Sequence, residues 1–464
     1  MKTVAIVLAA GKGTRMHSHL PKVAHRVAGM PMIIHVHATV LALGDVEPLY
    51  VIGHAYETVR ALLPNDAHTV LQAEQRGTGH AVAEALPEVP IDTEEIVVLY
   101  GDMPLITAET LQSLRHYHRE QGAELTMLSA ILTSPQGYGR VVRDTAGLPQ
   151  EIVEEKWLTA EQRTIREVNT GIYVISAAWL RASIASLPVH ADNELYLTDL
   201  VSVAAQQRGL AMLPTESSDE VLGVNDRLAL AQAEGIMRRR VNERAMLGGV
   251  TLVDPATAYI AADATIGMDT IIEPNVWIGP GVTIGEHCLI GSNSRIIGSA
   301  VGDHCMVQAS VIEFSELDEY VHIGPFSHLR PGAKLGPNVH LGNFAEVKNS
   351  VLGAGTHMGH FSYIGDATFG EQVNIGAGTV TVNYDGARKH RTTVGDQVAI
   401  GAGTMLRAPI VVGDRACTGT GSVVLSDVPP DTTVVGVPAR PIARTPRRSE
   451  GSSATLPARE DDKT

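Results

Sequence analysis

A short repeat organises the second half of the chain. Between about residue 266 and residue 423, an aliphatic residue followed by glycine or a substitute returns roughly every six residues. The pairs that follow this pattern are Ile266-Gly267, Ile278-Gly279, Ile284-Gly285, Ile290-Gly291, Val301-Gly302, Leu335-Gly336, Leu341-Gly342, Ile364-Gly365, Ile375-Gly376, Ile400-Gly401 and Val412-Gly413. A small residue often stands four positions after the aliphatic one, as at Thr270, Val282, Cys288, Thr356 and Thr404. The periodicity is typical of a parallel β-helix, whose hexads each form one short strand and a corner.

The composition agrees with a core built in this way. Hydrophobic residues make up 44% of the chain and aromatic residues only 4%, which suits stacked Ile, Val and Leu side chains. The chain contains 45 glycines, as frequent corners require. Of the three cysteines, Cys288 and Cys305 fall at the small inward position of a hexad. We therefore expect core thiols in a reducing compartment rather than a disulfide framework.

The first part of the chain alternates short aliphatic strands with helices. This alternation predicts an α/β domain with a mostly parallel sheet. The expected strands are Val4–Leu8, Pro48–Ile52, Ile96–Tyr100, Leu125–Ala130 and Gly171–Ile175, and the expected helices are Met32–Leu43, His80–Leu86 and Ala108–Gln121.

With 464 residues the chain is too long for a single core, and we divide it by these patterns. Residues 1–226 form the α/β domain, residues 227–247 a helical linker, and residues 248–440 the β-helix. Residues 441–464 are rich in Pro, Arg, Ser and Asp, and we expect them to be disordered. The hexads are interrupted at 313–320 and 381–393, where we expect extruded loops that are suited to carrying chemistry.

Charge and hydropathy exclude several classes of protein. The formal net charge of −15 argues against a nucleic-acid-binding surface, although a small basic pocket for phosphates remains compatible with it. No apolar stretch approaches the roughly 18 residues that a membrane span needs. Val4–Ala10 could pass for the apolar part of a signal peptide, but Gly11-Lys12-Gly13 follows it at once. We expect a cytoplasmic protein.

A glycine-rich segment, Leu8–Met16, follows the first expected strand, and Pro21-Lys22 comes shortly after it. Glycines in this position let backbone N–H groups approach phosphates, and Arg15 and Lys22 add the positive charge that a triphosphate needs. The spacing is neither that of a P-loop nor that of a dinucleotide fingerprint. The whole string resembles the nucleotidyltransferases that make nucleotide sugars. Arg15 and Lys22 are the expected catalytic cations.

Asp102 ends a buried strand, where ligands bind open α/β sheets. Its carboxylate suits Mg²⁺, whereas an isolated Gly-Asp would more simply be a turn. The resemblance implies Asn225 as a second metal ligand; its alternative role is the N-cap of the linker helix. It also implies that Gln72 and Thr78 meet a uracil edge. The UTP- and sugar-binding residues that follow are Leu8, Ala9, Ala10, Gly11, Lys22, Gln72, Gly77, Thr78, Tyr100, Gly101, Asp102, Gly139, Glu154, Asn169 and Asn225.

The β-helix carries a second set of motifs. These are Leu329–Ala333, Asn343–Lys348, Gly359–Asp366, Val373–Thr379 and Asn383–Gly386. With them, residues 1 to about 437 resemble the bacterial family of bifunctional N-acetylglucosamine-1-phosphate uridylyltransferases/glucosamine-1-phosphate N-acetyltransferases. The resemblance implies a Rossmann-like domain, a left-handed β-helix, a homotrimer with acetyl-transfer sites between subunits, and acetyl-CoA, UTP and Mg²⁺ as co-substrates and cofactor.

Acetyl transfer to an amine needs a general base with a pKa near neutrality, and histidine is the usual choice. His360 is the candidate because Arg330, Lys348 and Tyr363 lie in neighbouring coils, although a lone histidine is more often structural. Arg330 and Lys348 would grip a sugar phosphate; without the family they would be solvated corner charges. Tyr363 and Asn374 should line the same site. Acetyl-CoA is expected at Ala377, Asn383, Tyr384, Ala402, Thr420 and Arg440, with Asn383 and Tyr384 also orienting the amine and the sugar.

Two of these positions depart from the family. Ala402 stands where a serine is common, and Thr420 replaces an alanine, while Arg440 only loosely matches an arginine of the coenzyme A pocket. The expected function is acetylation of glucosamine-1-phosphate followed by coupling to UTP, giving UDP-N-acetylglucosamine for cell-wall and envelope synthesis. The alternative is a nucleotidyltransferase whose β-helix is only structural or regulatory. A purely structural protein is excluded by the intact Gly11–Lys22 string and Asp102.

Overall fold

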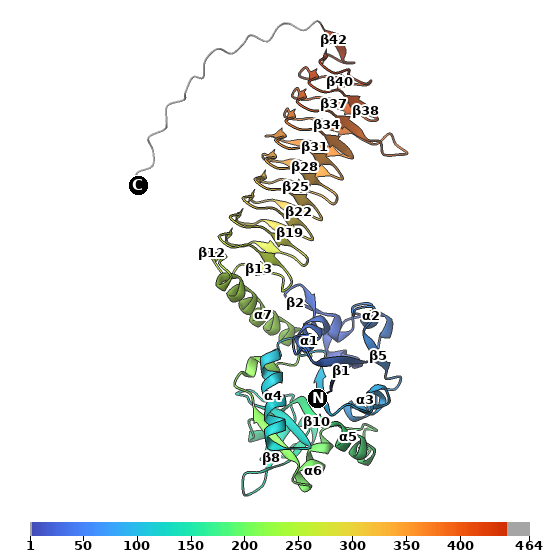
Figure 1. The fold of residues 1–464 in the computed structure, drawn as a ribbon, viewed down its shortest axis with the longest axis vertical. Coiled ribbons are helices and arrows are strands. Elements are labelled where there is room, and N and C mark those ends of the chain that lie inside the picture. Colours follow the sequence, from blue (N-terminus) through green and yellow to red (C-terminus); the bar gives the residue numbers. More distant parts are fainter. Residues whose placement is uncertain (1, 443–464) are drawn as a thin grey trace, which may run out of the picture. The chain divides into compact units, whose positions relative to one another are not determined.

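The computed structural model describes residues 2–442 of the chain, in two compact units (Figure 1). The first unit contains Met1–Ala245 and Tyr259–Ala264, and the second contains Met246–Ala258 and the chain from Thr265 onward. Apart from its first two residues, the tail that we expect to be disordered lies outside the described residues. No helix in the described part of the chain is long and apolar enough to cross a membrane.

The first unit is built on a mixed sheet whose central strands are parallel. The strand order is β11-β7-β10-β6-β1-β4-β5, and β10 is antiparallel to both β6 and β7. The expected strands and helices of this domain are confirmed, with ends that differ by a few residues. The strands are β1 (Thr3–Ala9), β4 (Val46–Ile52), β5 (His68–Leu71), β6 (Glu95–Tyr100), β7 (Leu125–Ile131), β10 (Glu167–Ser176) and β11 (Leu210–Pro214), with the hairpins β2 (Arg26–Val27)–β3 (Met30–Pro31) and β8 (Arg140–Arg143)–β9 (Pro149–Val153).

Helices cover both faces of this sheet, because every residue of β1 is buried and its side chains alternate between two apolar clusters. The helices of the unit are α1 (Met32–Leu41), α2 (Tyr56–Arg60), α3 (Thr78–Ala85), α4 (Ala108–Gln121), α5 (Ala177–Ser183), α6 (Asp199–Gln206) and α7 (Arg227–Leu247, whose last two residues belong to the second unit). Since β1 and β6 are parallel neighbours, with Leu8 beside Tyr100, their carboxyl ends open at the same edge of the sheet.

The second unit is a left-handed parallel β-helix, as the hexads predict. From β12 to β40 the parallel strands pair three positions apart in the chain, and near the end β39 pairs with β41 and β41 with β42, which gives sheets of twelve, ten and nine strands. Figure 1 shows the stacked coils. The strands run from β12 (Thr251–Leu252) to β42 (Arg440–Ile442), most of them two to four residues long. The aliphatic hexad residues Ile272, Ile278, Ile284 and Ile290 are at most 4% exposed, so they stack along the axis as expected.

The small inward residues are also buried, and the threonines among them donate hydrogen bonds to backbone carbonyls at the corners. Thr270 and Thr404 donate from Oγ1 to the carbonyls of Gly285 (2.8 Å) and Gly401 (2.6 Å). Cys288 and Cys305 are 2% and 1% exposed and are free thiols, so they are core residues as predicted. A carbonyl at a tight corner would otherwise be buried without a partner.

Of the two extruded loops that we predicted, the first is not present. Residues 313–320 extrude no loop, because β23 (Glu316–Leu317) pairs with both β20 (Ala300–Val301) and β26 (Lys334–Leu335). This coil is shorter, with Phe314 at a corner in the left-handed region (φ 45°). The second interruption is confirmed. The chain leaves β34 (Val380–Val382), forms a loop with an isolated bridge between Tyr384 and Lys389, and returns in β35 (Thr392–Val394).

Candidate active sites

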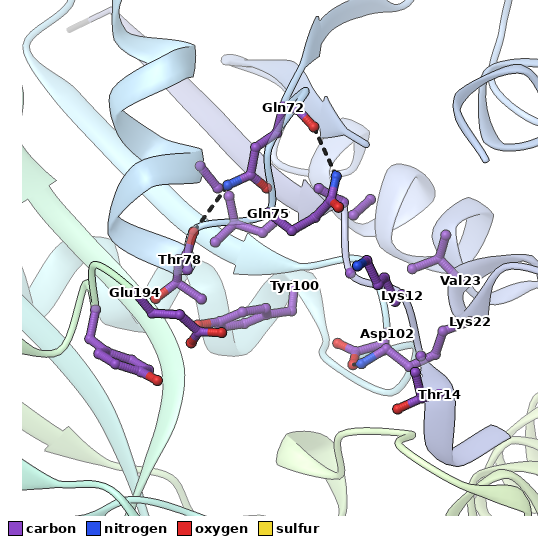
Figure 2. A pocket seen from close by; sticks show the side chains of 18 residues that line it. Lys12, Thr14, Lys22, Val23, Gln72, Gln75, Thr78, Tyr100, Asp102 and Glu194 are labelled. Atoms are coloured by element: carbon purple, nitrogen blue, oxygen red, sulfur yellow. Dashed lines mark hydrogen bonds and ion pairs between the residues drawn. The ribbon is translucent and has the colours of Figure 1, made fainter. Parts of the chain in front are cut away.

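The first candidate site is a cavity of about 500 Å³ at the carboxyl edge of the first sheet. Most of the residues expected to bind nucleotide line it, and they come from the loops after β1, β5 and β6 (Figure 2). The lining residues are Leu8, Ala9, Ala10, Gly11, Lys12, Gly13, Thr14, Lys22, Val23, Gln72, Gln75, Gly77, Thr78, Ala81, Tyr100, Asp102, Glu194 and Tyr196. Gly101 follows β6, and its N–H donates to the carbonyl of Leu8 in β1 at 2.9 Å.

The glycine-rich loop packs directly against Lys22. Gly13 has φ 58°, and a Cβ at this position would lie 2.7 Å from Lys22 Cβ. Only glycine therefore allows both the backbone conformation and the close approach of the two segments. The packing holds the lysine beside the loop Gly11–Thr14, which lines the cavity.

Lys22 joins the two residues that are expected to bind a metal. Its ammonium forms an ion pair with Asp102 Oδ2 and donates to Asn225 Oδ1 at 3.1 Å (Figure 2 shows Lys22 beside Asp102). The two oxygens thus converge on one cation. A carboxylate and an amide oxygen fit Mg²⁺, which takes one or two protein ligands and completes its shell with phosphate and water. Among the described residues no group of three or more His, Cys, Asp and Glu side chains offers a metal site.

The alternative role of Asn225 as a helix cap is wrong. Helix α7 begins at Arg227, and its cap is Asp226, whose Oδ1 accepts from the N–H of Ala229 at 2.9 Å. Asn225 instead directs its side-chain oxygen at Lys22 and donates weakly to the Gly223 carbonyl at 3.5 Å. Sequence alone could not separate two neighbouring residues that both suit a cap.

The two residues expected to read a base lie at the opposite end of the cavity from Lys22 (Figure 2). Gln72 is buried and donates from Nε2 to the Gly77 carbonyl at 3.1 Å, beside the His80 ring at 3.0 Å. Thr78 Oγ1 accepts from the N–H of Leu197 at 3.1 Å. The segment before Leu197 is bound to the same loop, because Gly79 N–H donates to the Leu195 carbonyl at 2.8 Å.

The three residues expected to bind sugar gather around Tyr100. Gly139 accepts from the N–H of Asn169 (2.9 Å), and a Cβ at Gly139 would lie 3.6 Å from Glu154 Oε2. Asn169 Oδ1 accepts from Tyr173 Oη at 2.9 Å. Burial raises the pKa of Glu154 above its ordinary value, against the hydrogen bond from Thr198 that lowers it. This cluster adjoins the cavity but does not line it.

Arg15, which we predicted as a catalytic cation, lies apart from the cavity, and several residues that line the cavity were not predicted. Arg15 is exposed in a 3₁₀ turn, Thr14–Met16, and does not line the cavity. Lys12 lines the cavity, and its place between two glycines was a usable signal. Gln75 lies in the same loop as Gln72 and Gly77, whereas no pattern in the sequence singled out Glu194 or Tyr196, which reach the cavity through tertiary packing of a distant segment.

The second candidate site lies on the β-helix. Arg330 follows β25 (His328–Leu329), Lys348 ends β28 (Ala345–Lys348) and Tyr363 lies in β31 (Ser362–Gly365), all on the ten-strand sheet. Arg330 Nη1 donates to Glu346 Oε1 at 2.9 Å, and Glu346 is in register with Tyr363. The three side chains are therefore carried by consecutive coils of one face.

Lys389, which the sequence did not single out, joins this group. A contact with the Lys389 ammonium, together with the charges of Lys389 and Arg330, lowers the pKa of Lys348. Lys389 reaches it from the loop between β34 and β35. Two ammonium groups and a guanidinium gathered on one face are suited to an anion such as a phosphate, although Arg330 is also paired with Glu346.

His360 lies on a corner shared with three of the six expected acetyl-CoA residues. It is exposed and follows β30 (His357–Met358), while Ala377, Ala402 and Thr420 occupy the same place in the next three coils. Backbone bonds join the coils: Gly378 N–H donates to the Phe361 carbonyl (2.6 Å), and Gly403 N–H to that of Ala377 (2.7 Å). We call these four residues the Gly-X-Gly column, after the sequence around Ala377, Ala402 and Thr420; at His360 the second glycine is replaced by Phe361. Asn374 lies in β33 (Asn374–Ile375) on the twelve-strand sheet.

The remaining expected residues lie at the two ends of this region. Asn383 and Tyr384 open the loop between β34 and β35, and Tyr384 Oη donates to the Gly386 carbonyl at 2.6 Å. Arg440 begins β42 and is exposed. Within one chain, Arg330, Lys348 and Tyr363 share the ten-strand face, whereas His360 stands at the corner that precedes it.

Comparisons with known proteins agree across both units. Residues 5–156 match the MobA-like NTP transferase domain, and residues 281–312 match the hexapeptide repeat of succinyl-transferase. The chain is 46% identical over 430 residues to the bifunctional protein GlmU of Heliobacterium modesticaldum, covering 92% of this chain and 94% of the relative. It is 44% identical over 438 residues to GlmU of Streptococcus equi subsp. zooepidemicus, covering 94% and 95%. GlmU of Lactococcus lactis subsp. cremoris is 45% identical over 438 residues, covering 94% and 96%.

Proposed function

Because the chain belongs to the family of bifunctional GlmU proteins, we propose that it makes UDP-N-acetylglucosamine in two reactions. The β-helix transfers acetyl from acetyl-CoA to glucosamine-1-phosphate, and the first domain couples the product to UTP with release of pyrophosphate. The observation that carries this proposal is that a cation-lined nucleotide cavity and a hexapeptide β-helix with a second cation cluster occur in one chain.

Uridylyl transfer is proposed to use the cavity at the edge of the first sheet. An oxygen of the sugar-1-phosphate attacks the α-phosphorus of UTP in line, and pyrophosphate leaves. Lys22 and Lys12 neutralise charge at one end, while Gln72 and Thr78 hold the base at the other. Mg²⁺ bound to Asp102 and Asn225 would supply further positive charge to the phosphates. Gly139, Glu154 and Asn169 are assigned to the sugar.

Acetyl transfer is assigned to the region between the Gly-X-Gly column and the ten-strand face. His360 takes a proton from the amine of glucosamine-1-phosphate, whose nitrogen attacks the thioester carbonyl and expels the thiol of coenzyme A. Arg330, Lys348 and Lys389 hold the phosphate. Ala377, Ala402 and Thr420 offer a narrow backbone surface to coenzyme A.

A homotrimer would complete this second site. Phe326, Phe344 and Phe361 stand at the corner of the Gly-X-Gly column and are 61%, 60% and 61% exposed. The rings of Phe326 and Phe344 are stacked with centroids 5.5 Å apart. A ladder of exposed phenylalanines is suited to burial against another copy of the chain. The proposal includes the division of the chain into a uridylyltransferase domain (residues 1–226), a helical linker (227–247) and an acetyltransferase β-helix (248–440). It also includes a location in the cytoplasm, where both co-substrates occur.

Two single variants test the proposal. Purified protein should release free thiol from acetyl-CoA with glucosamine-1-phosphate, and pyrophosphate from UTP with N-acetylglucosamine-1-phosphate. His360→Ala should lose the first activity and keep the second, and Asp102→Ala the reverse. Absence of any acetyl-CoA-dependent thiol release from the wild type would favour the alternative, a pyrophosphorylase with a structural or regulatory β-helix.

A further inference from the structure

Three corner residues of consecutive coils form a ladder beside the proposed acetyl-transfer site. They are Asn349, Asp366 and Asn383, and both hydrogen bonds between them join residues 17 positions apart. Asp366 Oδ1 accepts from Asn349 Nδ2 at 2.6 Å, and Asp366 Oδ2 accepts from Asn383 Nδ2 at 2.5 Å. Asp366 is 7% exposed and has φ 50°, in the left-handed region. A buried aspartate in this conformation is held by its partners.

Asp366 also binds both ends of the inserted loop. The loop departs at Asn383, whose amide is bonded to the carboxylate, and returns at Thr392, whose N–H donates to the Asp366 carbonyl at 3.2 Å. Within the loop, Asp385 accepts from the N–H groups of Ala387 (2.8 Å) and Arg388 (2.7 Å), so the tip has its own cap. Asp366 therefore bonds to the first and the last residue of the segment 383–392, and a further bond from Arg391 Nη2 to Thr368 Oγ1 (3.1 Å) joins the loop to the same coil.

The carboxylate remains ionised and can only accept hydrogen bonds. Burial alone would raise the pKa of Asp366, but hydrogen bonds from Asn349 and Asn383 and the charges of Lys389 and Lys348 lower it. Because a carboxylate accepts only, the NH₂ group of Asn383 must face it. The side-chain oxygen of Asn383 then points away from Asp366. An amide oxygen in that position is an acceptor for the N–H of an amine.

The space around Asn383 is closed on its other side. A Cβ at Gly365 would collide with Tyr363 Oη and would lie 2.9 Å from Asn383 Nδ2. The hydroxyl and the amide thus lie over the bare backbone of Gly365. The amide of Asn383 lies between Gly365 and the buried carboxylate of Asp366. Of its two possible orientations, only the one that turns the NH₂ group toward the carboxylate makes this hydrogen bond.

We propose that Asp366 is a positioning residue for acetyl transfer, which fixes Asn383 with its oxygen toward the substrate amine and anchors both ends of the 383–392 loop. The inference rests on the proposed acetyltransferase function. Asp366 itself touches neither substrate; it acts through Asn383 and the loop.

Asp366→Asn tests the inference with a side chain of the same shape. Its amide cannot accept from both asparagines, so one partner must flip or be released. Because one charge-assisted hydrogen bond to an asparagine is lost, we expect kcat/KM for acetyl transfer to fall about 100-fold. Pyrophosphate release should stay within twofold. Asn349→Ala, which removes the bond on the side away from the loop, is the matched control and should cost less than fivefold.

A double-mutant cycle separates positioning from a general structural effect. If Asp366 acts through Asn383, Asp366→Asn should lower acetyl transfer by less than threefold in an Asn383→Ala background. Trypsin cleavage after Arg388, Lys389 or Arg391 should also become at least tenfold faster in Asp366→Asn. Independent effects in the cycle, or unchanged cleavage, would overturn the inference. Failure of the proposed acetyltransferase function would look different. The wild type would then transfer no acetyl group, while trypsin would still cleave Asp366→Asn faster than the wild type.

Discussion

The ion pair between Lys22 and Asp102 makes a quantitative prediction about the nucleotide cavity. The two side chains are 17% and 10% exposed, so water screens their attraction only partly. Lys22→Met removes the cation, keeps the length of the side chain, and leaves the Asp102 carboxylate facing only Asn225 Oδ1 across the same space. Both remaining groups carry negative charge or partial negative charge, and neither can donate from its oxygen.

The magnitude follows from burial and distance. Two unit charges about 4 Å apart in an effective dielectric of about 20 attract by about 4 kcal/mol, and removing one partner of a buried pair costs about 3–5 kcal/mol. Since this pair is not fully buried, we expect a loss of about 3 kcal/mol. For a domain of this size, that corresponds to a fall of about 6–12 °C in its melting temperature. Loss of a preorganised charge at the phosphates should lower uridylyl transfer by about 10²–10³-fold.

Differential scanning calorimetry and pyrophosphate release together test this reasoning. The added substitution Asp102→Asn removes the uncompensated charge, so the double variant should melt above Lys22→Met although it stays inactive. Lys12→Met removes the same charge from an exposed position of the cavity and should change the melting temperature by less than 2 °C, on the usual scale of surface substitutions. A double variant that melts below Lys22→Met, or a single variant as stable as the wild type, would refute the electrostatic argument.

Three further predictions concern the sugar and acetyl ends. Gly365→Ala should lower acetyl transfer at least tenfold without affecting uridylyl transfer, because the added Cβ displaces Tyr363 Oη and Asn383; paired kinetic assays decide it. Gly171→Ala should raise the KM for N-acetylglucosamine-1-phosphate, since Gly171 has φ 80° and its Cβ would strike the Tyr100 ring; an unchanged KM would contradict the placement of the sugar cluster. The pKa of Glu154 is raised above its ordinary value of 4.5, so this residue stabilises the folded protein below pH 4.5 and the stabilisation is lost as pH rises through the folded-state pKa. Glu154→Gln should therefore make the melting temperature depend less on pH from about 4.5 upward, as a series of melting curves would show.

The repeat made the β-helix predictable, because an aliphatic residue at a fixed place in each hexad can only stack inside. The same regularity places His360, Ala377, Ala402 and Thr420 in one column, since each follows a glycine at the same place in its coil. It failed at residues 313–320, where a shorter coil keeps its strand pairing although its sequence breaks the pattern. A hexad count cannot distinguish a short coil from an extruded loop, because both interrupt the spacing.

Residues that act through tertiary contacts carried no signal of their own. Asp366 looks like an ordinary corner residue, and its partners, Asn349 and Asn383, become neighbours only after the coils stack. Glu194 and Tyr196 reach the nucleotide cavity because backbone bonds tie their segment to Gly79 and Thr78, far away in the sequence. In both units the sequence points to candidate binding residues that stand in local motifs, and misses residues whose contacts hold these motifs in place.

The β-helix also shows how an insertion can be held in a fixed place beside the proposed acetyl-transfer site. A loop of this kind would lose much conformational entropy if it had to be ordered on substrate binding. Here it leaves and rejoins a rigid coil at Asn383 and Thr392, and both points are bonded to Asp366. Lys389 is thereby brought beside Lys348 of an underlying coil before any phosphate is present. The repulsion between these two ammonium groups is balanced in part by the buried Asp366 carboxylate, so the residue that bonds to both ends of the loop also offsets part of the charge that the loop brings.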